Sequence, residues 1–408
     1  MKRYFLIALT LLMMCSFAEA RRRPNTAGSV PSIRKVKTDR RTTQPAVAPT
    51  VAPAPVSPPA QPFVTIGGLF QTDFMYFGNA SQLTGNSNWR QGKPYLLVQF
   101  TPDFSLNITY AMPQQQVDSL FFQNNFGEHV VLVGGQYTPV WGLENSADTS
   151  ALNMLELALP YGPFTPNYGL GGEVGFIFDP ITLWVGEYST RIGTQVPSPA
   201  PIAETINFEY SPVHTDTKLW AVILSAWQET TGGGNSFEFS AAPELTADNE
   251  GTLLATPDIT DAKNFWAGNA ALAWENGPLS LQGEYEHILI NRAQSLGNLG
   301  FDGYYAMASY FLTGESRLFN FEYSGYVDIT PIRHSYGAWQ VSTQFSYLNL
   351  NDLDIQGGQE RNWSLGLNFY PAKHLKYQLV YIRSWATPNS DGLNQNSNFL
   401  GFRMQLVF

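Results

Sequence analysis

Three carboxylates stand close together in a stretch of the chain that contains no basic side chain. They are Glu144, Asp148 and Glu156, within residues 140–168, and no Lys or Arg occurs in residues 94–190. Carboxylates in such a group can act as general acids, as metal ligands or, around a narrow water-filled passage, as a ring that favours cations. Which of these applies depends on the elements that position them.

The motifs of most catalytic and metal sites are missing from the sequence. The five histidines are far apart, no pair has the spacing of metal ligands, and no G-x-S-x-G elbow occurs. The glycines of residues 169–175 lack the G-x-G-x-x-G spacing of a nucleotide loop. We therefore expect no enzyme, cofactor, metal or nucleic-acid partner, with a barrel-type hydrolase kept as a minor alternative.

The N-terminal residues indicate export. Residues 1–20 combine Lys2 and Arg3, a short apolar run and an Ala-Glu-Ala ending, which predicts a secretory signal peptide. Residues 21–62 hold eight basic residues and one acid and then become rich in Pro and Ala, which predicts a disordered periplasmic linker. Residues 63–408 carry 13 basic against 31 acidic side chains, a net charge of −18. The only Cys lies in the signal segment, so the exported chain has no disulfide.

Residues 63–408 have the pattern of membrane strands. Apolar and polar residues alternate in many segments, for example in residues 104–110, 337–347 and 363–370. The polar face is often small and uncharged, and aromatic residues make up 14% of the chain. These features predict an all-β protein, a transmembrane antiparallel β-barrel of the bacterial outer membrane, in contact with its lipid and lipopolysaccharide. The alternative is a secreted β-sandwich.

Short turns alternate with long polar connections along these strands. Counting from the N-terminal side gives about 16 strands and makes residues 140–168 the third long loop, folded inward. Residues 313–335 fall where a short turn is expected. Either they form a long connection on the inner side, or the strand count is wrong by two.

Another long connection, residues 229–261, has seven acids and no basic residue. We interpret it as a solvated loop, with binding of divalent cations that bridge to lipopolysaccharide as the alternative.

Strand parity predicts which charged side chains point into the lumen. The candidates are Asp73, Glu209, Glu284, Glu286, Lys376 and Arg403. Two further basic residues, Arg317 and Arg333, would reach the constriction from the segment that could not be assigned. We predict that the three loop acids, Glu144, Asp148 and Glu156, line the pore constriction. The alternatives stay open: they face the wall, pair with Arg or lie on a solvated surface.

The chain ends in a strand pattern that closes with an aromatic residue. Phe402, Met404, Leu406 and Phe408 alternate outward, and Arg403 and Gln405 point inward. With the predicted signal peptide, a terminal Phe408 of this kind is typical of outer-membrane barrels and indicates recognition by the barrel-assembly machinery.

Several motifs resemble the phosphate-selective porin O and P family. They are GGQYTPVWGLENSADTSALNMLELALP (134–160), GFDGYYAMASYFLTGESR (300–317), GAWQVSTQFSYLNLND (337–352) and LGLNFYPAKHLKYQLVY (365–381), which keep the order of the family. The resemblance covers most of residues 90–408 and is weakest over residues 191–290. It implies a 16-stranded homotrimeric porin whose third loop narrows each channel, with selectivity for anions and above all phosphate.

The sequence departs from the family in its charges. The phosphate sites of that family use Lys and Arg, whereas the third-loop stretch here carries acids. We therefore expect a porin that passes ions and small hydrophilic solutes and favours cations. The alternatives are an anion- or phosphate-selective porin and a structural or adhesive surface barrel that transports nothing.

Overall fold

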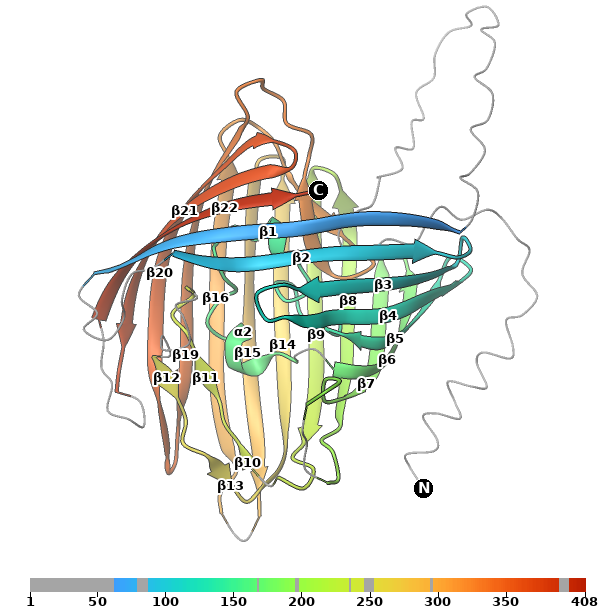
Figure 1. Ribbon diagram of the computed structural model, residues 1–408. Helices are drawn as coiled ribbons and strands as arrows, with labels where there is room; N and C mark the ends of the chain where they lie inside the picture. Colours follow the sequence, from blue (N-terminus) through green and yellow to red (C-terminus); the bar gives the residue numbers. More distant parts are fainter. Residues whose placement is uncertain are drawn as a thin grey trace, which may run out of the picture.

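The computed structural model describes residues 62–78, 87–166, 169–194, 198–234, 236–245, 253–293, 296–388 and 396–408. The predicted signal peptide and nearly all of the predicted linker lie outside these ranges. Within them, sixteen antiparallel strands form one closed barrel (Figure 1). The barrel strands are β1 (Phe63–Gly78), β2 (Ser87–Gln99), β3 (Phe104–Ala111), β4 (Gln116–Phe126), β5 (Val130–Tyr137), β6 (Gly169–Phe178), β7 (Ile181–Ser189), β8 (Ala203–Thr215), β9 (Lys218–Thr230), β14 (Ala262–Asn276), β15 (Leu279–Arg292), β16 (Leu299–Phe311), β19 (Ala338–Asp352), β20 (Ile355–Ala372), β21 (Leu375–Ala386) and β22 (Asn396–Val407).

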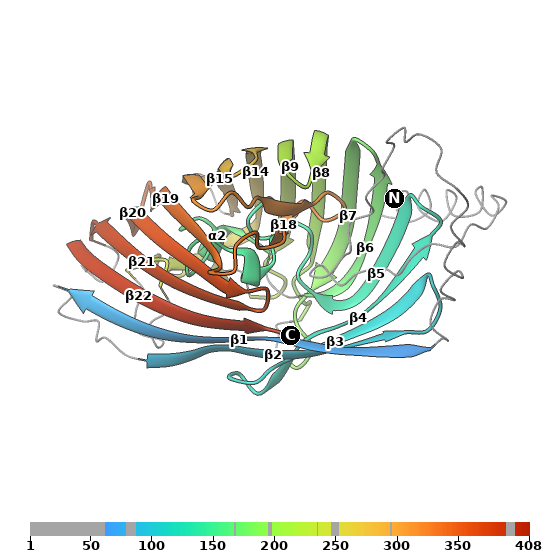
Figure 2. The same cartoon turned by 90° about the horizontal axis from the view of Figure 1, so that it is seen from above.

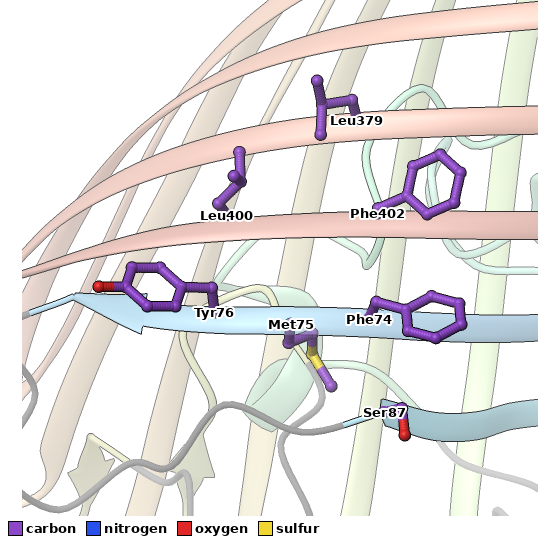
Figure 3. A pocket seen from close by; sticks show the side chains of 7 residues that line it. All are labelled: Phe74, Met75, Tyr76, Ser87, Leu379, Leu400 and Phe402. Atoms are coloured by element: carbon purple, nitrogen blue, oxygen red, sulfur yellow. The ribbon is translucent and has the colours of Figure 1, made fainter.

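The alternation of side chains gives the barrel an apolar outer face and a largely polar inner face. On β1, Phe74 and Tyr76 point outward and are 45% and 67% exposed, whereas Gln71 and Asp73 point inward and are each 1% exposed. Figure 3 shows the outward side chains of β1, β21 and β22 around a shallow hollow of about 350 Å³. Closure leaves no unpaired strand edge, which hydrocarbon surroundings require. In the described ranges no helix is long and apolar enough to cross a membrane.

The strand count and the topology of the prediction are confirmed. The first strand pairs with the last, β1 with β22, and every other barrel strand pairs with its neighbours in sequence. The connection after β5 is the third on the side of the long loops. Residues 312–337 connect β16 to β19 on the opposite side, so the first of the two alternatives for this segment is correct.

Three connections contain short elements of their own. The loop after β5, here called L3 (residues 138–168), contains η1 (Thr149–Ala151) and α2 (Tyr161–Phe164). The loop after β9, here called L5 (residues 231–261), contains two small sheets. They pair β10 (Ser236–Phe237) with β13 (Ile259–Thr260) and β11 (Ser240–Ala241) with β12 (Leu254–Ala255). The connection after β16 forms a hairpin of β17 (Arg317–Asn320) and β18 (Gly325–Ile329). Seen from above, α2 and β18 lie inside the ring of strands (Figure 2).

Candidate functional site

L3 is fixed to the inner wall at its first turn. The carboxylate of Glu284 on β15 accepts hydrogen bonds from the amides of Leu143 and Glu144 at 3.0 and 2.9 Å. The amide of Gly142 donates to Asn207 at 3.1 Å and to Ser225 at 3.0 Å. Gly142 has a φ of +60°, and a Cβ there would lie 2.8 Å from a Glu284 oxygen, so the position requires glycine. The wall thus binds the backbone of the loop.

The middle of L3 is held in the same way by side chains of β20, β21 and β22. The N–H groups of these side chains donate hydrogen bonds to the backbone carbonyls of the loop, which a neighbouring strand would otherwise provide. The bonds join Lys376 Nζ to Leu152 O (2.6 Å) and Ser150 O (3.3 Å), Gln378 to Leu152 O (3.1 Å), Asn368 to Asn153 O (3.0 Å) and Gln405 to Ser150 O (3.0 Å). L3 is therefore docked to the inner wall both at its first turn and at its middle.

Glu156 belongs to a network of four charged side chains where L3 meets the seam of the barrel. Arg90 of β2 donates to both oxygens of Glu156 at 2.6 Å, and Arg403 donates to Glu156 at 2.7 Å. Arg403 also makes two 2.7 Å bonds to Asp73 and a further bond to the carbonyl of Leu155. Burial alone would raise the pKa of Glu156, but the two guanidinium groups lower it to about 2. Glu156 is therefore ionised and paired, one of the open alternatives.

Glu144 is enclosed within L3. Its side chain is 2% exposed and accepts a hydrogen bond from the amide of Ala158 at 2.9 Å. Burial, more than the neighbouring Glu284, raises the pKa of Glu144 to about 8. At neutral pH its carboxyl is largely protonated and carries little charge toward the lumen.

Asp148 lies where L3 meets the β17–β18 hairpin. Its amide donates to the carbonyl of Tyr326 on β18 at 2.7 Å, and its carbonyl accepts from Ala151 at 2.8 Å. Burial, followed by the charge of Asp328, raises the pKa of Asp148 to about 8. The three loop acids thus differ in environment, and Glu156 is the one that is ionised at neutral pH.

These raised pKa values predict that the protein is less stable at alkaline pH. An acid whose folded pKa exceeds its unfolded value stabilises the fold fully below the unfolded pKa and loses that contribution as pH rises through the folded pKa. For Glu144 and Asp148 the window runs from 4.5 and 3.8 to about 8. We expect the urea concentration at the unfolding midpoint, measured in detergent micelles, to decrease as the pH is raised from 5 to 9. The decrease should be smaller in the E144Q/D148N variant. Equal slopes for both proteins would contradict this.

The six lumen candidates of the strands all lie on the inner face, beneath the inserted segments. Each is at most 4% exposed: Asp73, Glu209, Glu284, Glu286, Lys376 and Arg403. Three of them, Glu284, Lys376 and Arg403, contact L3 directly, and Asp73 binds Arg403. Glu286 accepts a bond from Asn269 at 3.2 Å. These side chains are covered by protein and do not face open channel water.

The β17–β18 hairpin crosses the barrel from β16 and β19 to the opposite wall. Trp184 of β7 donates to the carbonyl of Glu322 at 2.8 Å, Tyr323 bonds Gln123 of β4 at 3.1 Å, and Asn207 of β8 donates to Ser324 at 3.1 Å. The hairpin therefore restricts the lumen together with L3, which it contacts where the Asp148 amide donates to the Tyr326 carbonyl.

The two arginines predicted to reach the constriction have different positions. Arg317 of β17 is 5% exposed, bonds Gln282 of the wall and lies 3.4 Å over the ring of Tyr326. Arg333 is exposed, and its amide donates to Glu315 at 2.9 Å. Arg317 thus enters the barrel, and Arg333 remains at its rim.

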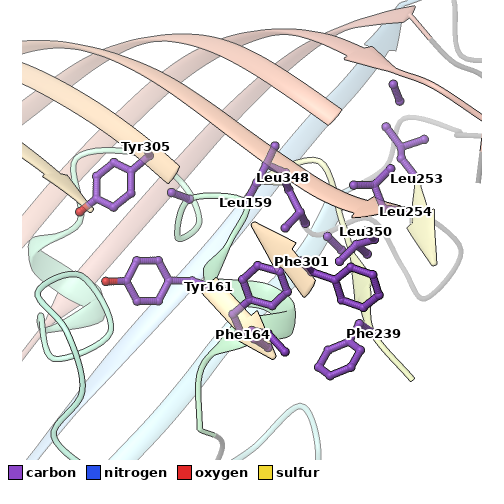
Figure 4. Packing of buried hydrophobic residues seen from close by; sticks show 14 of the residues in the cluster. Leu159, Tyr161, Phe164, Phe239, Leu253, Leu254, Phe301, Tyr305, Leu348 and Leu350 are labelled. Carbon is purple, nitrogen blue, oxygen red and sulfur yellow. The ribbon is translucent and has the colours of Figure 1, made fainter. Parts of the chain in front are cut away.

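Part of the described L5 folds inward, so our interpretation of it as a solvated loop is wrong for Phe239, Glu244 and Leu254. Glu238 and Asp258 are exposed, and Asp248 and Glu250 lie outside the described residues. Figure 4 shows Phe239, Leu253 and Leu254 of this loop packed with side chains of L3 and of β16 and β19. Glu244 is 4% exposed and accepts bonds from Ser346 at 2.6 Å, Gln344 at 3.0 Å and the amide of Leu159 at 3.1 Å. The acids of this loop predicted exposure to water, but its apolar residues and the hydroxyls and amides of the wall bury the part around Phe239 and Glu244.

Three basic side chains that the sequence did not single out remain partly exposed. Arg90 and Lys93 of β2 are each 23% exposed, and Arg191 is 22% exposed. Lys93 lies 2.8 Å from Asp118 of β4, and Arg191 lies 3.6 Å from the same carboxylate. Arg90 lies in β2 at the register shift in its pairing with β1, so counting alternate residues along the chain gives no signal for its position. The partly exposed surface around these residues therefore carries both positive and negative side chains.

A closed barrel with an apolar exterior, a polar interior and inserted loops defines the class of porins. The family model of the phosphate-selective porin O and P matches residues 92–408. The chain belongs to this family.

Two relatives match smaller parts of the chain. Porin O of Pseudomonas aeruginosa is 28% identical over 151 residues, 33% of this chain and 34% of the relative. An uncharacterized protein of Caulobacter vibrioides is 34% identical over 114 residues, 26% of this chain and 23% of the relative. The matches thus span about a third or less of the length of these relatives.

Solved porins share the fold. The trimer form of OmpT of Vibrio cholerae has a TM-score of 0.56 at 10% identity, over 85% of this chain and 99% of that chain. The anion-selective porin from Comamonas acidovorans gives 0.53 at 10% identity, with the same coverage. The outer membrane channel DcaP of Acinetobacter baumannii gives 0.53 at 10% identity, over 85% and 97%.

Proposed function

We propose that the protein lets ions and small hydrophilic solutes diffuse passively across the outer membrane. The observation that carries this proposal is the mixed set of partly exposed charges on the inner side, namely Arg90, Lys93, Arg191 and Glu156. Charged side chains are stable in a barrel interior when water reaches them, and a closed apolar interior would not contain them. L3 and the β17–β18 hairpin restrict the path, so only small solutes pass.

We further propose that the channel favours cations only weakly. Support comes from the net charge of −18 over residues 63–408. The preference is weak because Glu144 and Asp148 are largely protonated at neutral pH, and Glu156 is balanced by Arg90 and Arg403. The acids therefore do not act together as a strong ring.

Anion or phosphate selectivity is the second candidate, and a specific observation favours it. Arg90, Lys93 and Arg191 give the partly exposed inner surface three basic groups, and the porin O and P family is described as phosphate-selective. Basic groups along a pore favour anions.

The reversal potential in a KCl gradient across a planar bilayer decides between the two candidates. We expect a small reversal potential whose sign shows that potassium passes more readily than chloride. The K93Q variant should give a larger potential of the same sign, because that change removes a positive charge. A chloride potential that phosphate suppresses at millimolar concentration would favour the second candidate. Absence of channels from folded protein would instead favour a structural or adhesive barrel.

We propose three further properties for the cellular protein. Residues 1–20 direct its export, Phe408 takes part in recognition by the barrel-assembly machinery, and the barrel works as a homotrimer in outer-membrane lipid. The trimer form of OmpT supports the last of these by its fold. Chemical crosslinking in outer membranes, followed by electrophoresis without heating, would test it.

A further inference from the structure

Two arginines stand on the lipid-facing side of the barrel, among aromatic side chains. Arg361 of β20 is paired in register with Trp385 of β21, and Arg383 of β21 is paired with Trp363 of β20. Trp363 and Trp385 are 45% and 41% exposed on the outer face. Because side chains alternate along a strand, both arginines share this outward face and lie diagonally next to each other.

The position of the pair along the wall corresponds to the interface of lipid and water. The β20–β21 ladder begins with Glu360 opposite Ala386, at the end of the barrel that carries the long loops. Arg361 belongs to the next rung, and Arg383 lies two rungs further along. Aromatic girdles occupy this height in membrane barrels, and charged residues on the lipid face are tolerated there.

Both guanidinium groups have aromatic neighbours, and neither has a carboxylate partner in the described part of the chain. Arg383 lies 5.3 Å from the ring of Trp385 and donates to Asn398 at 3.3 Å, and Arg361 lies 5.9 Å from the ring of Tyr347. The ion pairs found among the described residues include neither arginine. Their charges are therefore available to an external anion.

A groove adjoins Arg361 on the same face. It has a volume of about 520 Å³ and is lined by Phe345, Gln359, Arg361, Trp385, Ala386, Thr387 and Asn396. One wall is aromatic and the rim carries amide and hydroxyl groups. A ligand that combines an anion with apolar chains matches this lining, since guanidinium groups bind phosphate through paired hydrogen bonds.

We propose that Arg361 and Arg383 form a binding site for the phosphate groups of a glycolipid in the outer leaflet. The phosphate lies between the two guanidinium groups, the sugar contacts Gln359, Thr387 and Asn396, and the acyl chains lie along Phe345 and the tryptophans. This site is on the outside of the barrel and is independent of the solute path.

Native mass spectrometry of the folded full-length barrel with added diphosphoryl lipid A tests this site. We expect the R361Q/R383Q variant to bind lipid A at least about tenfold more weakly than the parent protein, because two charge-assisted contacts are lost. The matched control is K263Q, which removes an exposed positive charge at the same end of β14. It should bind as the parent does.

Further arms identify the part of the lipid that is bound. Dephosphorylated lipid A and phosphatidylcholine should bind the parent and the double variant equally, and millimolar inorganic phosphate should compete poorly. The R361K/R383K variant keeps both charges and should bind lipid A with intermediate strength. It replaces the glutamine variant in the comparison if that variant does not fold. Undiminished binding of lipid A by R361Q/R383Q would overturn the proposal. So would a changed oligomeric mass with unchanged lipid binding, since that would make this face a contact between copies.

Discussion

Removal of the β17–β18 hairpin is expected to raise the single-channel conductance at least about twofold, because the hairpin crosses the lumen and ion flow depends on the free cross-section. Two hydrogen bonds at the base of the hairpin define where it can be removed. At the base of the hairpin, the Thr330 amide donates to the Ser316 carbonyl at 2.8 Å, and the Ser316 amide donates to the Thr330 hydroxyl at 2.9 Å. Residues 317–329 can therefore be replaced by Asn-Gly, which favours a tight two-residue turn.

Conductance in planar bilayers measures the effect, and R333Q is its control. Arg333 belongs to the same connection but is exposed at the rim, so its loss should leave the conductance unchanged. The deletion should also make Asp148 and its part of L3 more mobile, because Tyr326 O no longer accepts the Asp148 amide, and current noise should increase. An unchanged conductance in a folded deletion variant would show that the hairpin lies outside the ion path.

The R403Q variant is expected to lose about 3 to 5 kcal/mol of folding free energy, the usual cost of leaving a buried charge without its partner. Arg403 is 1% exposed and binds Asp73, itself 1% exposed, as well as Glu156 and the carbonyl of Leu155. Asp73 and Arg403 are also partners in register between β1 and β22, so the loss falls on the seam that closes the barrel.

Urea unfolding in detergent micelles, followed by gel mobility without heating, measures this loss. The D73N/R403Q variant provides the control, because it removes both charges of the pair. It should recover much of the stability. If R403Q were as stable as the parent protein, the four-charge network would contribute nothing to closure. If the double variant were no better than R403Q, the cost would come from the lost Leu155 and Glu156 contacts instead.

The architecture could be predicted from the sequence because it depends on local alternation. A period of two defines the two faces of each strand, and short turns alternating with long connections define the topology. Both are properties of neighbouring residues. The inner face of Glu284 and Lys376, and the place of L3 in the order of loops, follow from this pattern.

The environment of each charged side chain could not be predicted, because it depends on residues far away in the sequence. Glu156 is ionised because Arg90 and Arg403 meet it, from β2 and β22. Glu144 and Asp148 resemble it in sequence, but burial changes their protonation. A register shift between Gln71 and Thr72 also displaces the pairing of β1 with β2 near Arg90. Counting along the chain does not show such a shift.

The docking of L3 through its peptide groups makes this loop a suitable place for redesign. Lys376, Gln378, Asn368 and Gln405 bind carbonyls, which every residue type supplies. Residues of this segment whose side chains are only partly buried, such as Thr149 and Ser150, can therefore be exchanged while the scaffold remains the same. New solute preferences could be introduced there one side chain at a time, without rebuilding the barrel that carries them.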